Sequence, residues 1–202
     1  MRFISLDKNN GIELGLAGKL RFPPTNAVTP KNDDGKYYFD IGDSVSIDWS
    51  INTNFAGSTN YYIDDLTYEF VIDTDPTAGT SFSYAWDVQD IINTGAWDHA
   101  IGTNLTPASS GTVAVDSTNY AALIAVNNVA QNSWRIAWWG IDSSIDGTYD
   151  FHLSAFSSGD ELARTDIQII VGEGGAAVPE PATILLFGLG LLGVAGVSRR
   201  KQ

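Results

Sequence analysis

Alternation of apolar and polar residues around position 50 constrains the fold more than any other feature of the chain. From Val45 to Ile51 the odd-numbered residues are Val, Ile, Trp and Ile, and Ser, Asp and Ser stand between them. A period of two with β-branched and aromatic residues is typical of a strand that buries one face. Residues 68–72 repeat the pattern, and Phe82, Tyr84 and Trp86 form another aromatic face. The pattern predicts strands that pack their apolar faces on one core.

Further strand candidates are short apolar runs bounded by turn residues. They cover residues 12–22, 37–40, 120–129, 133–140, 149–156 and 165–171. The 20 glycines and the few leucine-rich windows favour an all-β chain rather than a helical one. We therefore predict an antiparallel β-sandwich over residues 1–171, jelly-roll-like in topology, with about eight to ten strands.

Charge and cysteine content exclude several classes of function. Residues 1–181 hold 8 Lys/Arg against 24 Asp/Glu, a formal charge of −16, and residues 182–202 add +3. Nucleic-acid binding depends on Lys and Arg that neutralise phosphates, so this balance argues against nucleic acid as a partner. Cysteine is absent, which excludes disulfides, zinc-thiolate sites and a thiol nucleophile.

The C-terminal residues differ sharply from the rest in composition. Residues 172–178 are a Gly/Ala-rich linker, and the sixteen residues from Ala182 to Val197 carry no charge. Sixteen residues of helix span about 24 Å, a little less than the ~30 Å hydrocarbon core, and the flanks can absorb the difference. Arg199, Arg200 and Lys201 then mark the cytoplasmic side. We predict a transmembrane helix at 182–197, since a buried helix of a soluble domain rarely lacks a polar face.

A short motif stands directly before this apolar stretch, and it consists of Pro179, Glu180 and Pro181. Together with the Gly/Leu-rich span and the terminal Arg-Arg-Lys, it resembles the PEP-CTERM sorting signal of Gram-negative bacteria, a tail also named ice-binding protein C-terminal domain. The resemblance is limited to residues 178–202, with the signal itself at 179–202. It implies that an exosortase, a transpeptidase-like membrane protease, recognises the Pro-Glu-Pro motif and removes the helix. The protein is then released or attached at the cell envelope, and such proteins are associated with exopolysaccharide and biofilm.

Export to that side of the membrane normally requires an N-terminal signal peptide. The apolar run after Met1 ends at Leu6, and Asp7 to Gly11 read as a turn. We therefore expect that the leader is missing from this sequence and lies upstream of Met1.

The sequence contains few of the residue patterns that catalysis requires. There are two histidines, His99 and His152, and no G-x-S-x-G elbow, which argues against a serine hydrolase. Two isolated histidines also lack the spacing of a zinc site. A glycosidase needs two carboxyl groups ~5–9.5 Å apart. No glutamate here forms a paired E-x-D-x-x-E strand motif, which leaves Glu69, on an exposed sheet face near Asp48, as a candidate whose position no sequence pattern fixes. We expect no catalytic residue.

Aspartates on predicted loops suggest a calcium site, because Ca²⁺ prefers hard oxygen ligands. The candidates are Asp33-Asp34, Asp64-Asp65, and the pair Asp73 and Asp75, which is the best of them. None completes an EF-hand loop. Aspartate is also frequent in turns because its side chain bonds the local backbone, and this second interpretation is the stronger one.

Tryptophan is abundant, with six residues in 202. They are Trp49, Trp86, Trp97, Trp134, Trp138 and Trp139. Because Trp138 and Trp139 are adjacent, one of them should face outward if they lie in a strand. An exposed indole can stack on a sugar ring, so Trp139 and Trp97 are candidate ligand contacts, although core packing accounts for most tryptophans of a sandwich.

These patterns predict an exported cell-surface or extracellular-matrix protein without catalytic activity and without a required cofactor. Its partners would be an exosortase and, before processing, the inner membrane. Two alternatives remain: a lectin-like glycan-binding module, assisted by Ca²⁺ and bound to extracellular polysaccharide, and a secreted hydrolase. Loss of polysaccharide binding with Trp139→Ala would favour the glycan-binding module. Loss of turnover with Glu69→Gln would favour the hydrolase.

Overall fold

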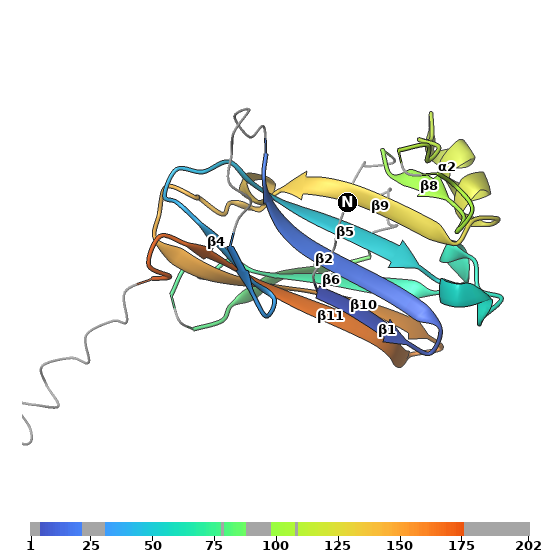
Figure 1. Ribbon diagram of the computed structural model, residues 1–202, viewed down its shortest axis with the longest axis horizontal. Helices are drawn as coiled ribbons and strands as arrows, with labels where there is room; N and C mark the ends of the chain where they lie inside the picture. The colour runs from blue at the N-terminus through green and yellow to red at the C-terminus, as the bar shows by residue number, and fades with distance from the viewer. Residues whose placement is uncertain (1–4, 22–30, 78, 88–97, 108, 176–202) are drawn as a thin grey trace, which may run out of the picture.

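The computed structural model describes residues 5–21, 31–77, 79–87, 98–107 and 109–175. In this part of the chain two β-sheets lie face to face (Figure 1), and no helix there is long and apolar enough to cross a membrane. The predicted helix at 182–197, the Pro-Glu-Pro motif, the basic C-terminal residues and Trp97 lie outside the described residues.

The first sheet has five strands in the order β1-β2-β5-β9-β8. Their bounds are β1 (Ser5–Asn9), β2 (Ile12–Leu20), β5 (Val45–Asn52), β9 (Val129–Arg135) and β8 (Ala100–Gly102). All neighbouring strands of this sheet are antiparallel.

The second sheet has six strands in the order β3-β4-β11-β10-β6-β7. Their bounds are β3 (Lys31–Asp33), β4 (Lys36–Phe39), β11 (Asp160–Val171), β10 (Gly147–Ser157), β6 (Thr67–Asp73) and β7 (Phe82–Trp86). Strand β4 runs parallel to β11, and the other pairs are antiparallel.

Four short helical segments connect the strands. They are the 3₁₀ turns η1 (Phe55–Gly57), η2 (Ile63–Asp65) and η3 (Ile136–Trp139) and the helix α2 (Ser117–Ile124). Helix α2 lies at one end of the sandwich, and β11 ends at the other, where the chain leaves for the C-terminal tail (Figure 1).

The predicted β-sandwich class is confirmed, and the sheets are antiparallel except at one pair, whereas the predicted number of about eight to ten strands is too low. Eleven strands are present in the described residues, and the parallel β4–β11 pair makes the second sheet mixed. The additional strands β1, β3 and β8 are short and have no alternating apolar residues that would mark a strand in the sequence. The jelly-roll connectivity stays a prediction.

Two strand predictions in the second half of the chain are wrong. Residues 120–129 do not form a strand, because α2 covers the first half of the segment and β9 begins only at its last residue. Asp116 caps the helix, and its Oδ1 accepts a hydrogen bond from the Asn119 backbone N at 2.8 Å. In the predicted strand 133–140, β9 ends at Arg135 and η3 follows, so Trp138 and Trp139 lie in a helical turn.

The inner faces of the two sheets form a single apolar core. The predicted inward residues of β5 are all buried, and aromatic rings connect the layers: Trp134 lies 5.2 Å from Trp49 and 5.7 Å from Phe70, between ring centroids. The largest fully buried side chains are Trp49, Tyr120, Phe70, Phe151, Ile12, Leu14, Leu16, Ile47, Ile51, Ile63, Ile72 and Ile101.

Strand β5 departs from the prediction of one exposed polar face. Ser46, Asp48 and Ser50 are buried as well, and Asp48 is only 3% exposed. The strand lies in the middle of its sheet, and the Lys19 ammonium forms an ion pair with Asp48 Oδ1 at 2.6 Å. The alternation therefore marks an apolar core face and a buried polar face.

The chain remains attached to the sandwich after β11 ends at Val171. Asp146 Oδ1 accepts hydrogen bonds from the backbone N of Glu173 at 2.7 Å and of Gly174 at 2.9 Å. Thr148 Oγ1 donates to the Gly174 carbonyl at 2.8 Å. The first residues of the predicted linker 172–178 are thus held against β10, and Pro179 follows only a few residues later.

Candidate functional site

A hollow on the outer face of the second sheet is lined by five polar side chains of β10 and β11. Strand register places Asp150 opposite Gln168, His152 opposite Asp166, and Ser154 opposite Arg164. Side chains alternate between the faces of a strand, so these residues point outward while their neighbours enter the core. The neighbours are Phe151, Leu153, Thr165, Ile167 and Ile169, all buried.

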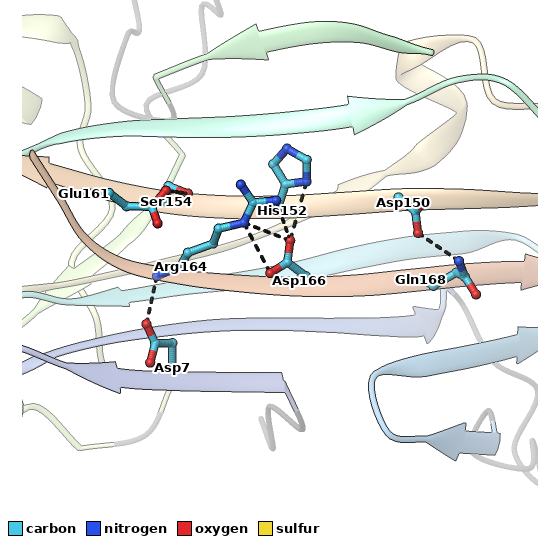
Figure 2. A network of polar contacts seen from close by, with 8 residues as sticks. All are labelled: Asp7, Asp150, His152, Ser154, Glu161, Arg164, Asp166 and Gln168. Carbon is cyan, nitrogen blue, oxygen red and sulfur yellow. Dashed lines mark hydrogen bonds and ion pairs between the residues drawn. The ribbon is translucent and has the colours of Figure 1, made fainter. Parts of the chain in front are cut away.

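The three cross-strand pairs follow one another along the two strands, as Figure 2 shows. At one end Gln168 Nε2 donates to Asp150 Oδ1 at 2.9 Å. In the middle Arg164 Nε and Nη2 donate to Asp166 Oδ1 at 3.1 and 2.9 Å, and His152 Nδ1 lies 3.6 Å from the same oxygen. These contacts fix the planar amide, carboxylate, imidazole and guanidinium groups in place.

The far end of the network connects the site to the first sheet and to the beginning of β11. Ser154 Oγ donates to Glu161 Oε2 at 3.1 Å, and the Arg164 backbone N donates to Asp7 Oδ2 at 2.8 Å (Figure 2). Asp7 belongs to β1, so an edge strand of the opposite sheet helps to hold β11.

The hollow is bounded on two sides by other elements and encloses about 520 Å³. On one side Phe82 of β7 is 50% exposed, and its ring centroid lies 4.9 Å from that of His152 at an interplanar angle of 59°. On the other side Asp34, Gly35 and Lys36 form the β3–β4 turn, where the Gly35 carbonyl accepts a hydrogen bond from Gln168 N at 2.9 Å. Gly35 has φ +81°, a conformation that favours glycine.

Burial governs the protonation of the histidine in this hollow. It lowers the pKa of His152 below its usual value, and the positive charge of Arg164 acts in the same direction, against the opposing effect of Asp166. Hydrogen bonding to Asp166 raises the pKa of Arg164. At neutral pH the site therefore presents a neutral imidazole beside a guanidinium–carboxylate pair.

Charges of both signs alternate around the hollow. Lys36 and Arg164 are cationic, whereas Asp34, Asp150 and Asp166 are anionic. In the described part of the chain, no group of three His, Cys, Asp or Glu side chains is arranged to hold a metal ion. The arrangement offers hydrogen-bond donors and acceptors side by side.

The predicted calcium pair lies in a loop that its own carboxylates organise. Asp73 is buried, and its Oδ1 accepts hydrogen bonds from the backbone N of Asp75 at 3.0 Å and of Ser81 at 2.7 Å. Asp75 Oδ1 accepts from the Thr77 backbone N at 2.9 Å, which lowers the pKa of Asp75. Both side chains make the turn contacts that the stronger interpretation expects, and metal binding stays a prediction.

The predicted sugar contact Trp139 is partly buried. Its ring centroid lies 5.8 Å from that of Trp134 and 6.1 Å from that of Phe70, so it packs against the core. Trp138 is the exposed member of the pair, at 59%, and its ring lies 5.7 Å from the Arg21 guanidinium carbon. A ligand role for Trp139 stays a prediction.

The predicted proximity of Glu69 and Asp48 is wrong. Glu69 is exposed on the outer face of β6 in the second sheet, whereas Asp48 is on the outer face of β5 in the first. The core separates the two faces, so these carboxylates cannot act together on one substrate. The alternation of β6 and β5 showed that both face outward but not which sheet each joins.

The hollow itself was missed by the sequence analysis, although part of it left a signal. Polar residues at positions 150, 152 and 154 and at 164, 166 and 168 alternate with apolar or buried ones, which predicts two polar faces. Ser158 and Gly159 between these strands, both with positive φ, are typical of a tight hairpin turn that joins the faces.

Comparison with known proteins finds a family match on a short segment of the chain and only weak similarity to a solved structure over most of it. No curated protein matches the chain. Among solved structures, the soluble domain of PmoD from a Methylocystis species is 11% identical, with 84% of this chain and 98% of that chain covered and a TM-score of 0.32. A superposition this weak supports no inference.

The local match falls on the C-terminal tail and confirms the resemblance seen in the sequence. It includes Pro179, Glu180 and Pro181 and the basic residues Arg199, Arg200 and Lys201. Residues 177–201 of the chain are a PEP-CTERM protein-sorting motif, which indicates recognition by an exosortase and a secreted or cell-envelope location in a Gram-negative bacterium.

Proposed function

We propose that the chain is an exported binding or structural protein without catalytic activity, displayed at or released from the cell surface after an exosortase processes its tail. Residues 182–197 would anchor it transiently in the inner membrane, and the processed sandwich would join the envelope or the biofilm matrix. The observation that carries the proposal is the sorting motif at residues 177–201.

The way in which the chain leaves the sandwich supports this proposal. Asp146 and Thr148 hold the backbone at Gly174, which stands five residues before Pro179 in the sequence. A protease that acts at this motif would cut close to a finished domain, and the product would keep the whole sandwich.

The contacts of the carboxylates on the outer sheet face support a role in which these carboxylates do not act as general acid or base. Asp166 is engaged by Arg164, and Asp150 accepts from Gln168. General acid–base chemistry requires a group free to exchange a proton with the substrate. Carboxylates held in charge-assisted or amide contacts serve better as fixed acceptors.

Replacing Glu180 should block processing. In a native host, the wild-type protein should appear outside the cell or in the envelope with an intact mass that corresponds to an end near Pro181. The Glu180→Ala variant should remain full-length, ending at Gln202, in the membrane fraction. Intact-mass measurement on both fractions checks this.

Glu173→Ala is the matched control, since Glu173 is an exposed carboxylate shortly before the motif. It should be processed like the wild type. A wild-type protein that stays full-length in the membrane would overturn the processing proposal and leave the tail as a plain anchor.

A further inference from the structure

We propose that the hollow between β7, β10, β11 and the β3–β4 turn binds a neutral polysaccharide. The proposal deepens the proposed function and rests on it, because only a protein delivered outside the cell meets such a polymer. The site residues are Lys36, Phe82, Asp150, His152, Arg164 and Gln168.

The spacing of the polar groups suits an extended chain of hydroxylated rings. Each cross-strand pair is separated from the next by two residues, or ~6.8 Å along the strands. The Asp150–Gln168 and His152–Asp166 pairs and the Arg164 guanidinium beside Asp166 line a shallow, open surface, whereas Ser154 is only 2% exposed. Such a track accepts a polymer lengthwise rather than a small enclosed molecule.

The chemistry of the track matches hydroxyl groups, which both donate and accept hydrogen bonds. Asp150 and Asp166 accept, Arg164 and Lys36 donate, and Gln168 does both. Asp150 accepts a hydrogen bond from Gln168, although a carboxylate has about four acceptor sites, and a guanidinium has five N–H donors, so Asp150 and Arg164 keep hydrogen-bonding capacity for a ligand. The groups are already oriented, which lowers the entropic cost of binding.

Phe82 supplies an apolar surface beside these polar groups. It lies on the edge strand β7, and half of its surface is exposed, so core packing does not explain it. The His152 ring at 4.9 Å supports one side of it. The apolar C–H face of a sugar ring can pack on such an aromatic ring while its hydroxyls reach the track.

The charges and the size of the hollow favour a neutral polysaccharide over an anionic polymer, a metal ion or a protein partner. An anionic polymer would meet Asp34, Asp150 and Asp166 in a chain whose formal net charge is −13. A metal ion would need three ligating side chains, and the described residues bring no such group together. A protein partner would need a much larger surface than this hollow.

The binding test is affinity electrophoresis of the full chain in a detergent without a sugar head group. The gels contain hydroxyethylcellulose or dextran, which are neutral, or alginate, which is anionic. We expect a neutral polymer to retard the protein, and Phe82→Ala to weaken that retardation about tenfold, the equivalent of one aromatic contact. Gln168→Ala, which removes the amide from the other end of the track, should weaken it as well.

Trp138→Ala is the matched control, because it removes an equally exposed aromatic ring that lies outside the hollow. The proposal would be overturned if no polymer retarded the protein or if alginate alone did. It would also be overturned if a neutral polymer retarded the wild type and both hollow variants equally, or if Trp138→Ala were the only variant to lose binding. The fractionation of the Glu180→Ala variant tests sorting independently of polysaccharide binding. A negative result in the electrophoresis is therefore distinguishable from a failure of the proposed function.

Discussion

Lowering the pH from 6.5 to 4 should remove about 3 kcal/mol of the free energy of unfolding through His99 alone, on the basis of its pKa of about 4 in the folded protein. The side chain is 0% exposed, and burial is the main cause of the lowered pKa, while the nearby Asp98 opposes it. An unfolded chain would take up the proton near pH 6.5, but the folded one must hold the ring neutral.

The surroundings of His99 explain why the folded protein disfavours the protonated, charged imidazole. The Trp49 and Tyr120 rings lie 4.9 and 5.4 Å from the imidazole, between ring centroids, and the Trp134 ring lies at 6.0 Å. His99 Nδ1 forms a hydrogen bond with the Tyr120 hydroxyl at 3.0 Å. Nε2 is buried and has no hydrogen-bond partner among the described residues, so a proton there would be poorly solvated.

The direction of the effect follows from the lowered pKa of a base. Stability from the neutral ring is fully present above pH 6.5 and is lost as the pH falls to 4. Below pH 4 both states carry the proton, and the loss is complete. Carboxylates titrate in the same range, so the contribution of His99 has to be isolated by comparison with a variant.

Urea unfolding of the wild type and of His99→Asn at several pH values between 6.5 and 4 makes that comparison. The asparagine keeps a polar atom near Nδ1 but cannot be protonated, so its stability deficit should shrink by about 3 kcal/mol across the range. His152→Asn is the control, since His152 is partly exposed and should contribute a smaller dependence. Parallel stability curves for the wild type and His99→Asn would show that His99 is not the acid-labile group.

Local patterns predicted most of the fold, because alternation is a property of a single strand. The segment from Val45 to Ile51 became β5, and residues 149–156 and 165–171 lie within β10 and β11. Helix α2 was missed because Tyr120 to Ala125 are an uninterrupted apolar run without a helical period, and the clearest signal of the helix is the capping residue Asp116. The parallel β4–β11 pair joins segments far apart in sequence, and no local pattern encodes it.

The candidate site could be predicted only as far as single strands allow. Alternation identifies Asp150 and Gln168 as outward residues, and the hairpin between their strands makes them neighbours. Phe82 and Lys36 join them only through the sheet order, because β7 and β4 are separated by three strands. The same missing information led to the wrong pairing of Glu69 with Asp48.

Asp73→Ala should cost about 3 kcal/mol of stability, because two backbone N–H groups would lose their charged acceptor. Asp73 is 1% exposed at the end of β6. Its Oδ1 accepts hydrogen bonds from the backbone N–H groups of Asp75 and Ser81, which stand near the two ends of the loop between β6 and β7. Asp73→Asn keeps an oxygen in this place and should lose less than half as much. Asp75 lies at the surface, so Asp75→Ala should leave the urea midpoint almost unchanged.

Calcium titration of the same three variants separates the loop role of Asp73 from metal binding. A ligand that binds only the folded state raises the melting temperature with its concentration. If Asp73 serves the backbone alone, millimolar Ca²⁺ should leave the melting temperature of the wild type unchanged, and the order of the variants should be the same with and without the ion. A calcium-dependent rise that Asp73→Asn and Asp75→Ala both abolish would instead establish the metal site. It would also mean that the carboxylates turn from the loop N–H groups toward the ion, because the oxygen that now accepts from Asp75 and Ser81 has few lone pairs left for a cation.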